Sequence, residues 1–344
     1  MNYSTHFRLA SVAFIGASAV GLTLSHSAPA TAQTEIILNI FTPASHPFAL
    51  INKGWANDAA KASGGQLKFR IPVKTLAPPP RQWSMVTSGV ADAASLANIF
   101  ETRRLTLTEL ATLPFGTTIS GWKSSIALWK TYKKYFESAN EYKGVKLLGL
   151  FLHPGGDLNM GKVKINKATD LRNIKIRVAR GMASKEMKAM GAVLVVTPGI
   201  KTFEVVSKGI VDGAILPMGD IWKLKMIPYI KTIYTIPGKF YNTPFSTIMN
   251  KKKWDGLNPA QKKAIDDNTG LNIARHAKVW DDQTAEAMPH LIKGGIKVQQ
   301  ISDDVVRVMK EKFASFDADW IASAAKKGVD GKAALAYYRA QSKM

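Results

Sequence analysis

Hydrophobic and charged residues follow one another in two stretches of the chain in the order that βαβαβ units produce. In the second stretch Ile174, Ile176 and Val178 alternate with basic residues, the pattern of a strand with one buried face. The apolar runs 193–196 and 211–216 are further expected strands, and the helically spaced segments between the three strands each end at a glycine. This order of elements predicts parallel strands joined by right-handed crossovers.

The first stretch lies before residue 100 and shows the same order of elements. It predicts strands at 35–42, 67–71 and 91–96, with a helix across 48–59 and a short helix around Trp83. Ligands bind beyond the carboxyl ends of the strands in such sheets, so side chains near those ends are candidate ligand contacts. Two such units in one chain predict an α/β protein with two domains and a cleft between them.

A helical pattern occupies much of the region after residue 250. Asn258 and Pro259 form an expected helix start, with an asparagine N-cap, proline at the first helical position and a glutamine at N3. The pattern continues to about residue 292, and Gly270 and Pro289 are expected to bend it. One helix of that length would span both domains.

The first 32 residues are expected to be a secretory signal peptide. Arg8 precedes the apolar run 9–24, and Ala30-Thr31-Ala32 is an A-x-A cleavage signal. We therefore expect cleavage after Ala32 and a soluble mature protein in the periplasm. The chain contains no cysteine, so we expect neither a lipid anchor at the cleavage site nor disulfides.

The chain is strongly basic, with 47 Lys and Arg against 25 Asp and Glu and a formal net charge of +22. Such a balance fits a solvated basic surface, a nucleic-acid binder or a field that attracts anions. The basic residues are scattered, apart from small clusters at 133–134 and 251–253, and no nucleic-acid-binding motif accompanies them. We expect no nucleic-acid partner and favour the solvated surface, with attraction of anions as an added effect.

The sequence motifs of common enzyme classes are absent. There is no G-x-S-x-G, H-E-x-x-H, P-loop or G-x-G-x-x-G sequence. An exported enzyme acting on anionic substrates is the competing class, but no base, nucleophile and orienting residue can be assembled from the sequence. The histidines show no metal-ligand spacing. We expect no enzymatic activity, no cofactor and no metal.

Three residues near the ends of predicted strands are candidates for the cleft. His46 and His153 each precede a proline, and such loop histidines more often bond to the backbone than to a ligand. Arg177 lies near the carboxyl end of its strand. On spacing alone, a ligand contact and a structural ion pair are equally good interpretations of this arginine.

The run from Asp170 to Asp220, with DLRNIKIRV, MGAVLVVTP and KGIVDGAILP in that order, resembles the extracytoplasmic solute-binding proteins of TRAP transporters, the DctP-type family. The segments 89–94 (GVADAA), 107–115 (LTELATLPF) and 249–254 (MNKKKW) also occupy the family's order. The resemblance implies an α/β, two-lobed periplasmic binding protein of type II-like architecture. Its lobes would enclose a central cleft, with a long helix bridging both of them.

The resemblance also implies lobe boundaries and a function. Lobe I would comprise 33–154 and 243–284, and lobe II 155–242 and 285–344, after the signal peptide 1–32. The expected function is a receptor that binds a monocarboxylate, aromatic or a 2-oxo or hydroxy acid, in the cleft. As a monomer it would deliver the solute to the integral-membrane permease subunits of a TRAP transporter. There are two alternatives. The same fold could serve as a ligand sensor for a signalling partner, or it could bind a C4-dicarboxylate.

Four positions depart from the pattern of the family and bear on the solute. Leu216 replaces an asparagine that family members often carry, Gly199 replaces a phenylalanine, and Lys201 replaces a glutamate. Asp157 falls where some sugar-acid binders have a second arginine. The site therefore loses polar groups for a second carboxylate and gains room, which argues for a monocarboxylate with an apolar or aromatic body.

The resemblance assigns the carboxylate of the solute to Arg177. A planar guanidinium can hold a carboxylate through two parallel hydrogen bonds, which fixes orientation as well as charge. Apolar walls would then select solutes by shape. The other candidate ligand-binding residues are His46, Trp83, Asn98, Phe115, Thr197, Leu216, Met218 and Tyr241.

Overall fold

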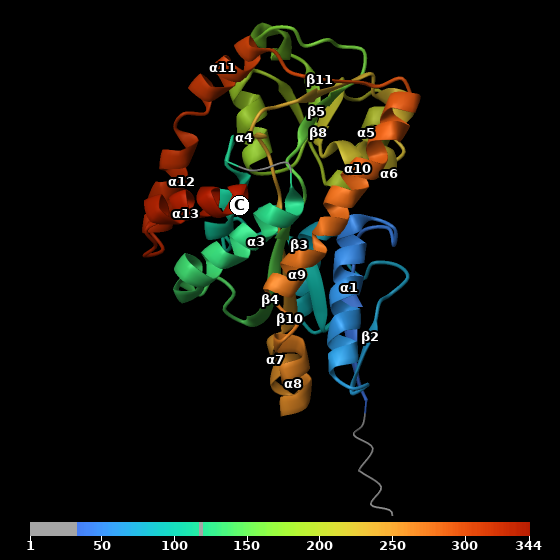
Figure 1. The fold of residues 1–344 in the computed structure, drawn as a ribbon, viewed down its shortest axis with the longest axis vertical. Helices are drawn as coiled ribbons and strands as arrows, with labels where there is room; N and C mark the ends of the chain where they lie inside the picture. Colours follow the sequence, from blue (N-terminus) through green and yellow to red (C-terminus); the bar gives the residue numbers. More distant parts are fainter. Residues whose placement is uncertain (1–32, 117–119) are drawn as a thin grey trace, which may run out of the picture. The chain divides into compact units, whose positions relative to one another are not determined.

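The computed structural model describes residues 33–116 and 120–344, in which two mixed β-sheets form (Figure 1). The first sheet has the order β2-β1-β3-β10-β4, with β10 antiparallel to both neighbours. The second has the order β11-β9-β5-β8-β6-β7, with β5 antiparallel to both neighbours. The predicted signal peptide lies outside the described residues.

The strands of the first sheet are β1 (Thr34–Asn39), β2 (Leu67–Arg70), β3 (Ala93–Ala97), β4 (Val145–Leu152) and β10 (Pro244–Asn250). Those of the second are β5 (Asp157–Met160), β6 (Lys175–Val178), β7 (Val193–Val196), β8 (Gly213–Leu216), β9 (Thr232–Thr235) and β11 (Lys297–Gln300). The helices are α1 (Pro47–Ala62), α2 (Gln82–Thr87), α3 (Gly121–Thr131), α4 (Met182–Ala189), α5 (Thr202–Ser207), α6 (Met218–Lys223), α7 (Lys251–Asp255), α8 (Pro259–Asp266), α9 (Leu271–His276), α10 (Lys278–Lys293), α11 (Asp303–Lys312), α12 (Phe316–Ala325) and α13 (Gly331–Lys343).

Both predicted βαβαβ units are confirmed, as β1-α1-β2-α2-β3 and β6-α4-β7-α5-β8. Within each unit the adjacent strands pair in parallel. Ile176 and Val178 are fully buried, as the alternation predicts. Arg177, which the alternation places on the opposite face of β6, is buried as well. Charged side chains are rarely fully buried, so the burial of Arg177 marks it as a candidate functional residue.

The prediction of one continuous helix from 259 to 292 is wrong, because the structure divides this region into α8, α9 and α10. Gly270 causes one break: it has a φ of 63°, which is outside the helical region, and its N–H donates to the carbonyl of Leu148 at 2.7 Å. A Cβ at this position would lie 2.4 Å from the ring of Trp129. Pro289, in contrast, remains inside α10 without ending it.

The bridging role belongs to α10, which packs against α1, α3 and α6 (Figure 1). Two neighbouring side chains show how. Asp281 accepts hydrogen bonds from Ser120 at 2.5 Å and from the N–H of Gly121 at 2.7 Å, at the start of α3. Trp280 instead donates to Asp220 of α6 at 3.4 Å. One helix therefore contacts elements beside both sheets.

Two segments connect the sheets: 153–156 joins β4 to β5, and 236–243 joins β9 to β10. They lie against each other, since the N–H of Gly156 donates to the carbonyl of Tyr241 at 2.8 Å. A Cβ at Gly156 would lie 2.4 Å from the ring of Tyr241. Glycine at this position permits the close approach of the two segments.

An ion pair is buried at the same crossing. The ammonium of Lys239 pairs with the carboxylate of Asp157, and both side chains are almost wholly enclosed. Burial raises the pKa of Asp157, and the charge and hydrogen bond of Lys239 oppose that shift. Gly155 makes room for the lysine, because a Cβ there would lie 2.4 Å from Lys239 Cβ.

The C-terminal helices bear on the predicted lobe boundaries. α13 packs against α3, and α12 packs against the turn of helix at Leu107–Thr112. Trp320 and Tyr338 belong to the same core cluster as residues of β3 and β4. These helices therefore accompany the first sheet, although the prediction assigned 285–344 to the second lobe. The boundaries themselves stay a prediction.

Candidate functional site

A cavity of about 450 Å³ lies where strands of both sheets end. From the first sheet it is lined by residues that follow β1, β3 and β4. From the second it is lined by residues at or after the carboxyl ends of β6, β7 and β8. This is where the order of the elements predicted ligand contacts. Its size suits a small organic molecule.

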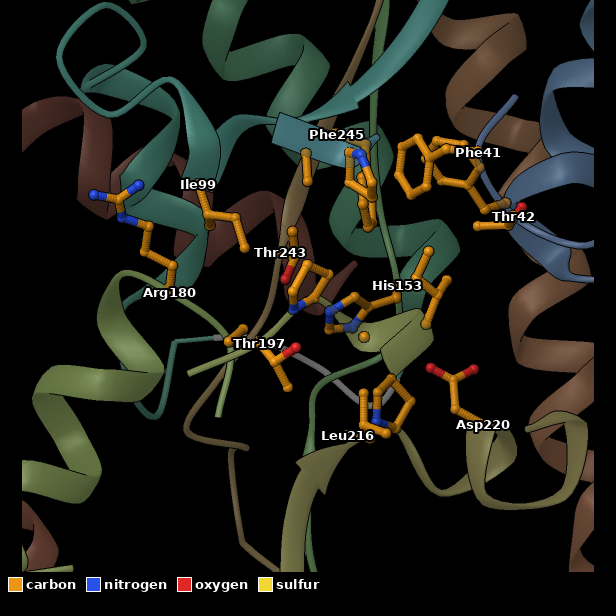
Figure 2. Close-up of a pocket in the computed structure, with 18 of the residues that line it drawn as sticks. Phe41, Thr42, Ile99, His153, Arg180, Thr197, Leu216, Asp220, Thr243 and Phe245 are labelled. Atoms are coloured by element: carbon orange, nitrogen blue, oxygen red, sulfur yellow. The ribbon is translucent and has the colours of Figure 1, made fainter. Parts of the chain in front are cut away.

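The walls are largely apolar. Figure 2 shows Phe41, Ile99 and Phe245 on one side of the drawn cavity and Leu216 on the opposite side. Phe245 stacks on Trp280 of α10, with ring centroids 5.8 Å apart and an angle of 18° between the planes. Flat aromatic surfaces of this kind favour a ligand with a flat apolar body.

Arg177 provides buried positive charge in the lining, and backbone carbonyls hold it in place. Its Nε donates to the carbonyl of Thr197 at 3.1 Å, and Nη1 donates to the carbonyl of Ile215 at 3.1 Å. Nη2 also donates to Thr197, so three of the five N–H groups are engaged. Burial lowers the pKa of Arg177 to about 10, which leaves the guanidinium charged at neutral pH.

No acidic side chain of the described residues forms an ion pair with Arg177, so the ion-pair interpretation does not describe this structure. Asp220 is near enough to favour the charged form, but only at longer range. Because the arginine is fixed by neutral carbonyls and carries a full charge, it is prepared to bind an anion. The remaining N–H groups can supply the hydrogen bonds.

His46 and Asp220 form a second polar group in the lining. His46 is the N-cap of α1, and its Nδ1 accepts from the N–H of Phe48 at 3.2 Å. Nε2 therefore carries the proton, and it lies 3.7 Å from Asp220 Oδ1. Burial, followed by the charge of Lys223, lowers the pKa of His46 to about 4. Burial also raises the pKa of Asp220.

The depressed pKa of His46 predicts a loss of stability in acid. The unfolded chain takes up a proton below the ordinary pKa of 6.5, whereas the folded chain does so only near 4. The contribution is therefore present above pH 6.5 and is lost as the pH falls. Relative to His46→Asn, which keeps an N-cap acceptor, the wild type should lose about 1–2 kcal/mol between pH 7 and 5. Urea unfolding at both pH values measures this, and a pH-independent difference would contradict it.

His153 follows β4, and its ring lies among the labelled lining residues in Figure 2. Its Nδ1 lies 2.5 Å from the carbonyl oxygen of Pro154. Its ring is also near those of Tyr241 and Trp280, with centroids 5.2 and 5.6 Å away. Burial lowers the pKa of His153 to about 4, so the imidazole is neutral at physiological pH.

Five of the nine predicted site residues line this cavity. They are Arg177, His46, Thr197, Leu216 and Tyr241. They come from β6, β8 and three connecting segments, and the fold alone brings them together. Their contact with a ligand stays a prediction.

Two of the remaining predicted residues, Asn98 and Trp83, are held in the first-sheet core instead. The Asn98 amide donates to Thr108 at 2.9 Å and accepts from Ser246 at 2.7 Å, so its polar groups are used internally. Trp83 belongs to the core cluster around α2, with the guanidinium of Arg104 4.4 Å above its ring. Neither lines the cavity.

Phe115 and Met218 also lie outside the cavity lining. Phe115 stacks on Phe313 with ring centroids 6.2 Å apart, and its backbone has a φ of 56°. Met218 is the first residue of α6 and packs into the cluster that contains Ile221. Residue type suggested these two as apolar walls, but the direction of their side chains takes them into the core.

The sequence did not identify several residues that line the cavity. Ile99 and Asp220 follow the ends of β3 and β8, and their position after a strand was a usable signal. His153 carried the same signal and was named as a candidate for the cleft, but it was not among the nine predicted ligand-binding residues. Phe245 lies within β10 and Trp280 within α10, where nothing in the local sequence points to a ligand.

Gly199 lies directly beside the guanidinium. A Cβ at this position would be 3.8 Å from Leu216 Cδ2 and 4.0 Å from Arg177 Nη2, which are ordinary contact distances. The glycine begins a short turn of helix, Gly199–Lys201, and its φ is outside the left-handed region. A larger residue is therefore allowed by the backbone and would project between the arginine and the apolar wall.

Two kinds of feature do not occur within residues 33–116 and 120–344. No group of three or more His, Asp or Glu side chains lies close enough together there to hold a metal ion. No helix in this part of the chain has the length and apolar character needed to cross a bilayer.

Comparisons with known proteins place the chain in a family of bacterial solute-binding proteins. The model of bacterial extracellular solute-binding proteins, family 7 (DctP), matches residues 38–322. The outer membrane transporter protein TsaT of Comamonas testosteroni is 32% identical over 312 residues, which cover 90% of this chain and 92% of TsaT.

Solved structures show the same fold. A TRAP periplasmic solute-binding protein from Bordetella bronchiseptica, with bound (R)- and (S)-mandelate, has a TM-score of 0.86 at 29% identity, covering 90% of this chain and 99% of its own. A TRAP solute-binding protein from a marine metagenome, specific for aromatic acids and crystallised with 3-hydroxybenzoate, has a TM-score of 0.81 at 27% identity, covering 91% and 98%. The two-lobed periplasmic binding fold predicted from the sequence is confirmed.

Proposed function

Because this chain belongs to family 7 of the bacterial extracellular solute-binding proteins, the DctP family, we propose that it is the solute receptor of a TRAP transporter and that its solute is an aromatic monocarboxylate. Residues 1–32 direct export to the periplasm and are removed after Ala32. The mature protein, a monomer, carries the solute to the permease subunits in the membrane and performs no chemistry on it.

The environment of Arg177 is the observation that carries this proposal. The guanidinium is fully enclosed, three of its N–H groups are fixed on backbone carbonyls, and the described residues offer it no carboxylate at ion-pair distance. A carboxylate from a solute would complete its coordination through a charge-assisted pair of hydrogen bonds. Such a pair gains strength because the guanidinium is buried away from bulk water.

The shape of the cavity supports an aromatic body for the solute. Phe41, Ile99, Phe245 and Leu216 present apolar surface, and the site has space beside the arginine at Gly199. Each ring face that a solute stacks on adds about 0.5–1.5 kcal/mol beyond its buried area. The two relatives with bound mandelate and 3-hydroxybenzoate carry solutes of this class.

Among the described residues, the cavity offers a buried basic partner, Arg177, for only one carboxylate of a solute. Asp157, where sugar-acid binders of the family have a second arginine, pairs with Lys239 and does not line the cavity. Asp220 does line it, and would repel a second carboxylate when ionised. Arg180 lines the edge, but it is exposed, and in Figure 2 its side chain points away from the other labelled residues. An exposed ion pair would return little for a second buried charge.

Closure of the lobes would enclose the solute. Lobe I comprises 33–154 and 243–284, and lobe II 155–242 and 285–344, subject to the packing of α12 and α13 beside the first sheet. The two crossing segments are the hinge, since closure around a ligand needs only a few residues to change their φ and ψ angles.

A thermal-shift screen of organic acids, followed by calorimetry, tests the proposed function. A solute that binds only the folded state stabilises it by about 2.7 kcal/mol at a hundredfold excess over Kd. Benzoates, phenylacetates and mandelate should give the largest shifts, and succinate, malate and sialic acid little or none. If a dicarboxylate stabilised the protein most and no aromatic acid had an effect, the proposal would be wrong.

Substitution of Gly199 tests the space assigned to the ring. Gly199→Phe should fill the cavity beside Arg177 and lower the affinity for aromatic acids by about 1–3 kcal/mol, or about 5- to 150-fold. Gly199→Ala is the matched control, because a Cβ there makes only ordinary contacts, and should stay within about threefold of the wild type. Calorimetry measures both. Equal affinities for the phenylalanine variant and the wild type would show that the ring lies elsewhere.

A further inference from the structure

One ring nitrogen in the cavity lining has no hydrogen-bond partner among the described residues. It is Nε2 of His153, a buried atom on a side chain that is only 4% exposed. An unsatisfied polar atom of this kind costs free energy in the folded state and calls for an explanation. His153 is not used to position Arg177, whose three hydrogen bonds within the protein go to backbone carbonyls.

The tautomer of His153 follows from its other nitrogen. Nδ1 lies 2.5 Å from the carbonyl oxygen of Pro154, and two acceptors cannot approach so closely, so Nδ1 carries the proton and donates it. Burial keeps the ring neutral by lowering its pKa to about 4. Nε2 is therefore a lone-pair acceptor that requires a donor.

The polar groups on the rings that pack around His153 are engaged elsewhere. The indole N–H of Trp280 donates to Asp220, and the hydroxyl of Tyr241 is bonded to Thr243 at 2.8 Å. Phe245, the third ring beside His153, has no donor. The second histidine of the lining, His46, directs its Nε2 proton toward Asp220. No described group donates to Nε2 of His153, and because the residue lines the cavity, the donor can come from a solute.

We propose that Nε2 of His153 accepts a hydrogen bond from a hydroxyl group of the solute, so that the receptor selects hydroxylated aromatic monocarboxylates over their deoxy analogues. This inference rests on the proposed function, because it assigns a second polar contact to the solute that Arg177 binds. A carboxylate oxygen cannot fill the position, since it would face the lone pair of Nε2. A hydroxyl can, because it supplies the proton.

The selectivity arises from the buried acceptor that the wrong solute leaves unpaired. A site built to bond a hydroxyl rejects the analogue that lacks it more strongly than a hydrophobic pocket rejects a missing methylene. Leaving a buried acceptor without its donor costs enough to lower affinity by about 5- to 100-fold. A bound water that bonded Nε2 equally well in both complexes would remove the difference.

Calorimetry with matched pairs of solutes tests the inference on the wild-type protein. The pairs are mandelate with phenylacetate, 3-hydroxybenzoate with benzoate, and 3-hydroxyphenylacetate with phenylacetate. We expect at least one hydroxylated member to bind about 5- to 100-fold more tightly than its deoxy partner. If every deoxy acid bound within threefold of its partner, the inference would be overturned while the proposed function stood. If no aromatic acid bound at all, the proposed function itself would fail.

The variant His153→Phe tests whether His153 is the acceptor, because phenylalanine keeps a ring of similar shape but has no acceptor atom. This variant should lose the preference for the hydroxylated acid over its deoxy partner, whatever its affinity for the deoxy acid. His290→Phe is the matched control: His290 stacks on Trp222, with centroids 4.3 Å apart, and does not line the cavity, so the preference should persist. A preference that survives in His153→Phe would assign the hydroxyl to another group. Nitrogen-15 NMR of labelled histidines in the wild type gives a second readout. The chemical shift of His153 Nε2 should change when the hydroxylated acid binds and should not change when the deoxy acid binds.

Discussion

Arg177→Ala should lower the affinity for the preferred monocarboxylate by about 2–5 kcal/mol, which is roughly 30- to several-thousand-fold. The solute would keep its negative charge in a largely apolar cavity and lose the partner that offsets the cost of burying it. Arg177→Lys should recover only part of the affinity, because an ammonium cannot form the paired hydrogen bonds of a guanidinium. Calorimetry with the tightest-binding acid from the screen measures both variants.

Arg180→Ala is the matched control for this result. Arg180 lines the same cavity and follows Arg177 by three residues, but it is exposed. Its removal should change affinity by no more than about threefold, since exposed ion pairs contribute little. If Arg177→Ala bound within threefold of the wild type, or if Arg180→Ala had the larger effect, the carboxylate would be bound by a different residue.

Lys239→Met should lower the free energy of unfolding by about 3–5 kcal/mol. Lys239 pairs with Asp157 where the two segments cross, and both side chains are almost wholly buried. Methionine fills a similar volume but leaves the carboxyl of Asp157 without a charged partner, so the aspartate must be protonated or remain a buried charge. Urea unfolding monitored by circular dichroism measures the change.

An exposed ion pair, that of Lys263, is the control for the effect of Lys239→Met on the free energy of unfolding. Lys263 pairs with Asp267 at 2.8 Å, but both side chains are mostly exposed, and Lys263→Ala should leave the free energy of unfolding nearly unchanged. In the double variant Asp157→Leu with Lys239→Met, part of the lost stability should return, because no unpaired charge remains. Equal effects of Lys239→Met and Lys263→Ala would show that burial of the pair has no consequence for stability.

The fold was largely predictable because its units are local. Period-2 alternation located β6, and Gly191 and Gly209 marked helix ends, where the structure gives them φ values of 85° and 65°. The position of Arg177 near the end of β6 was predictable for the same reason. Its burial was not, since alternation placed it on a polar face, and only the tertiary structure shows that β7 and β8 flank it.

Features that depend on contacts between distant segments were not predictable. The helix after Asn258 is divided because Gly270 packs against Trp129, which lies far away in the sequence. Phe115 and Met218 were chosen for their apolar character, yet the directions of their side chains place them in the core. Phe245 and Trp280 reach the cavity from a strand and a helix whose local sequence resembles that of any core element. The tautomer of His153 could be assigned only from the position of the Pro154 carbonyl.

A crystal structure of the protein with the acid that stabilises it most tests the central claim directly. The account predicts a single carboxylate with both oxygens about 3 Å from the guanidinium nitrogens of Arg177, and an aromatic ring against Ile99, Phe245 and Leu216. A solute with two carboxylates, or a carboxylate bound at Arg180 with the guanidinium of Arg177 left unoccupied, would contradict it.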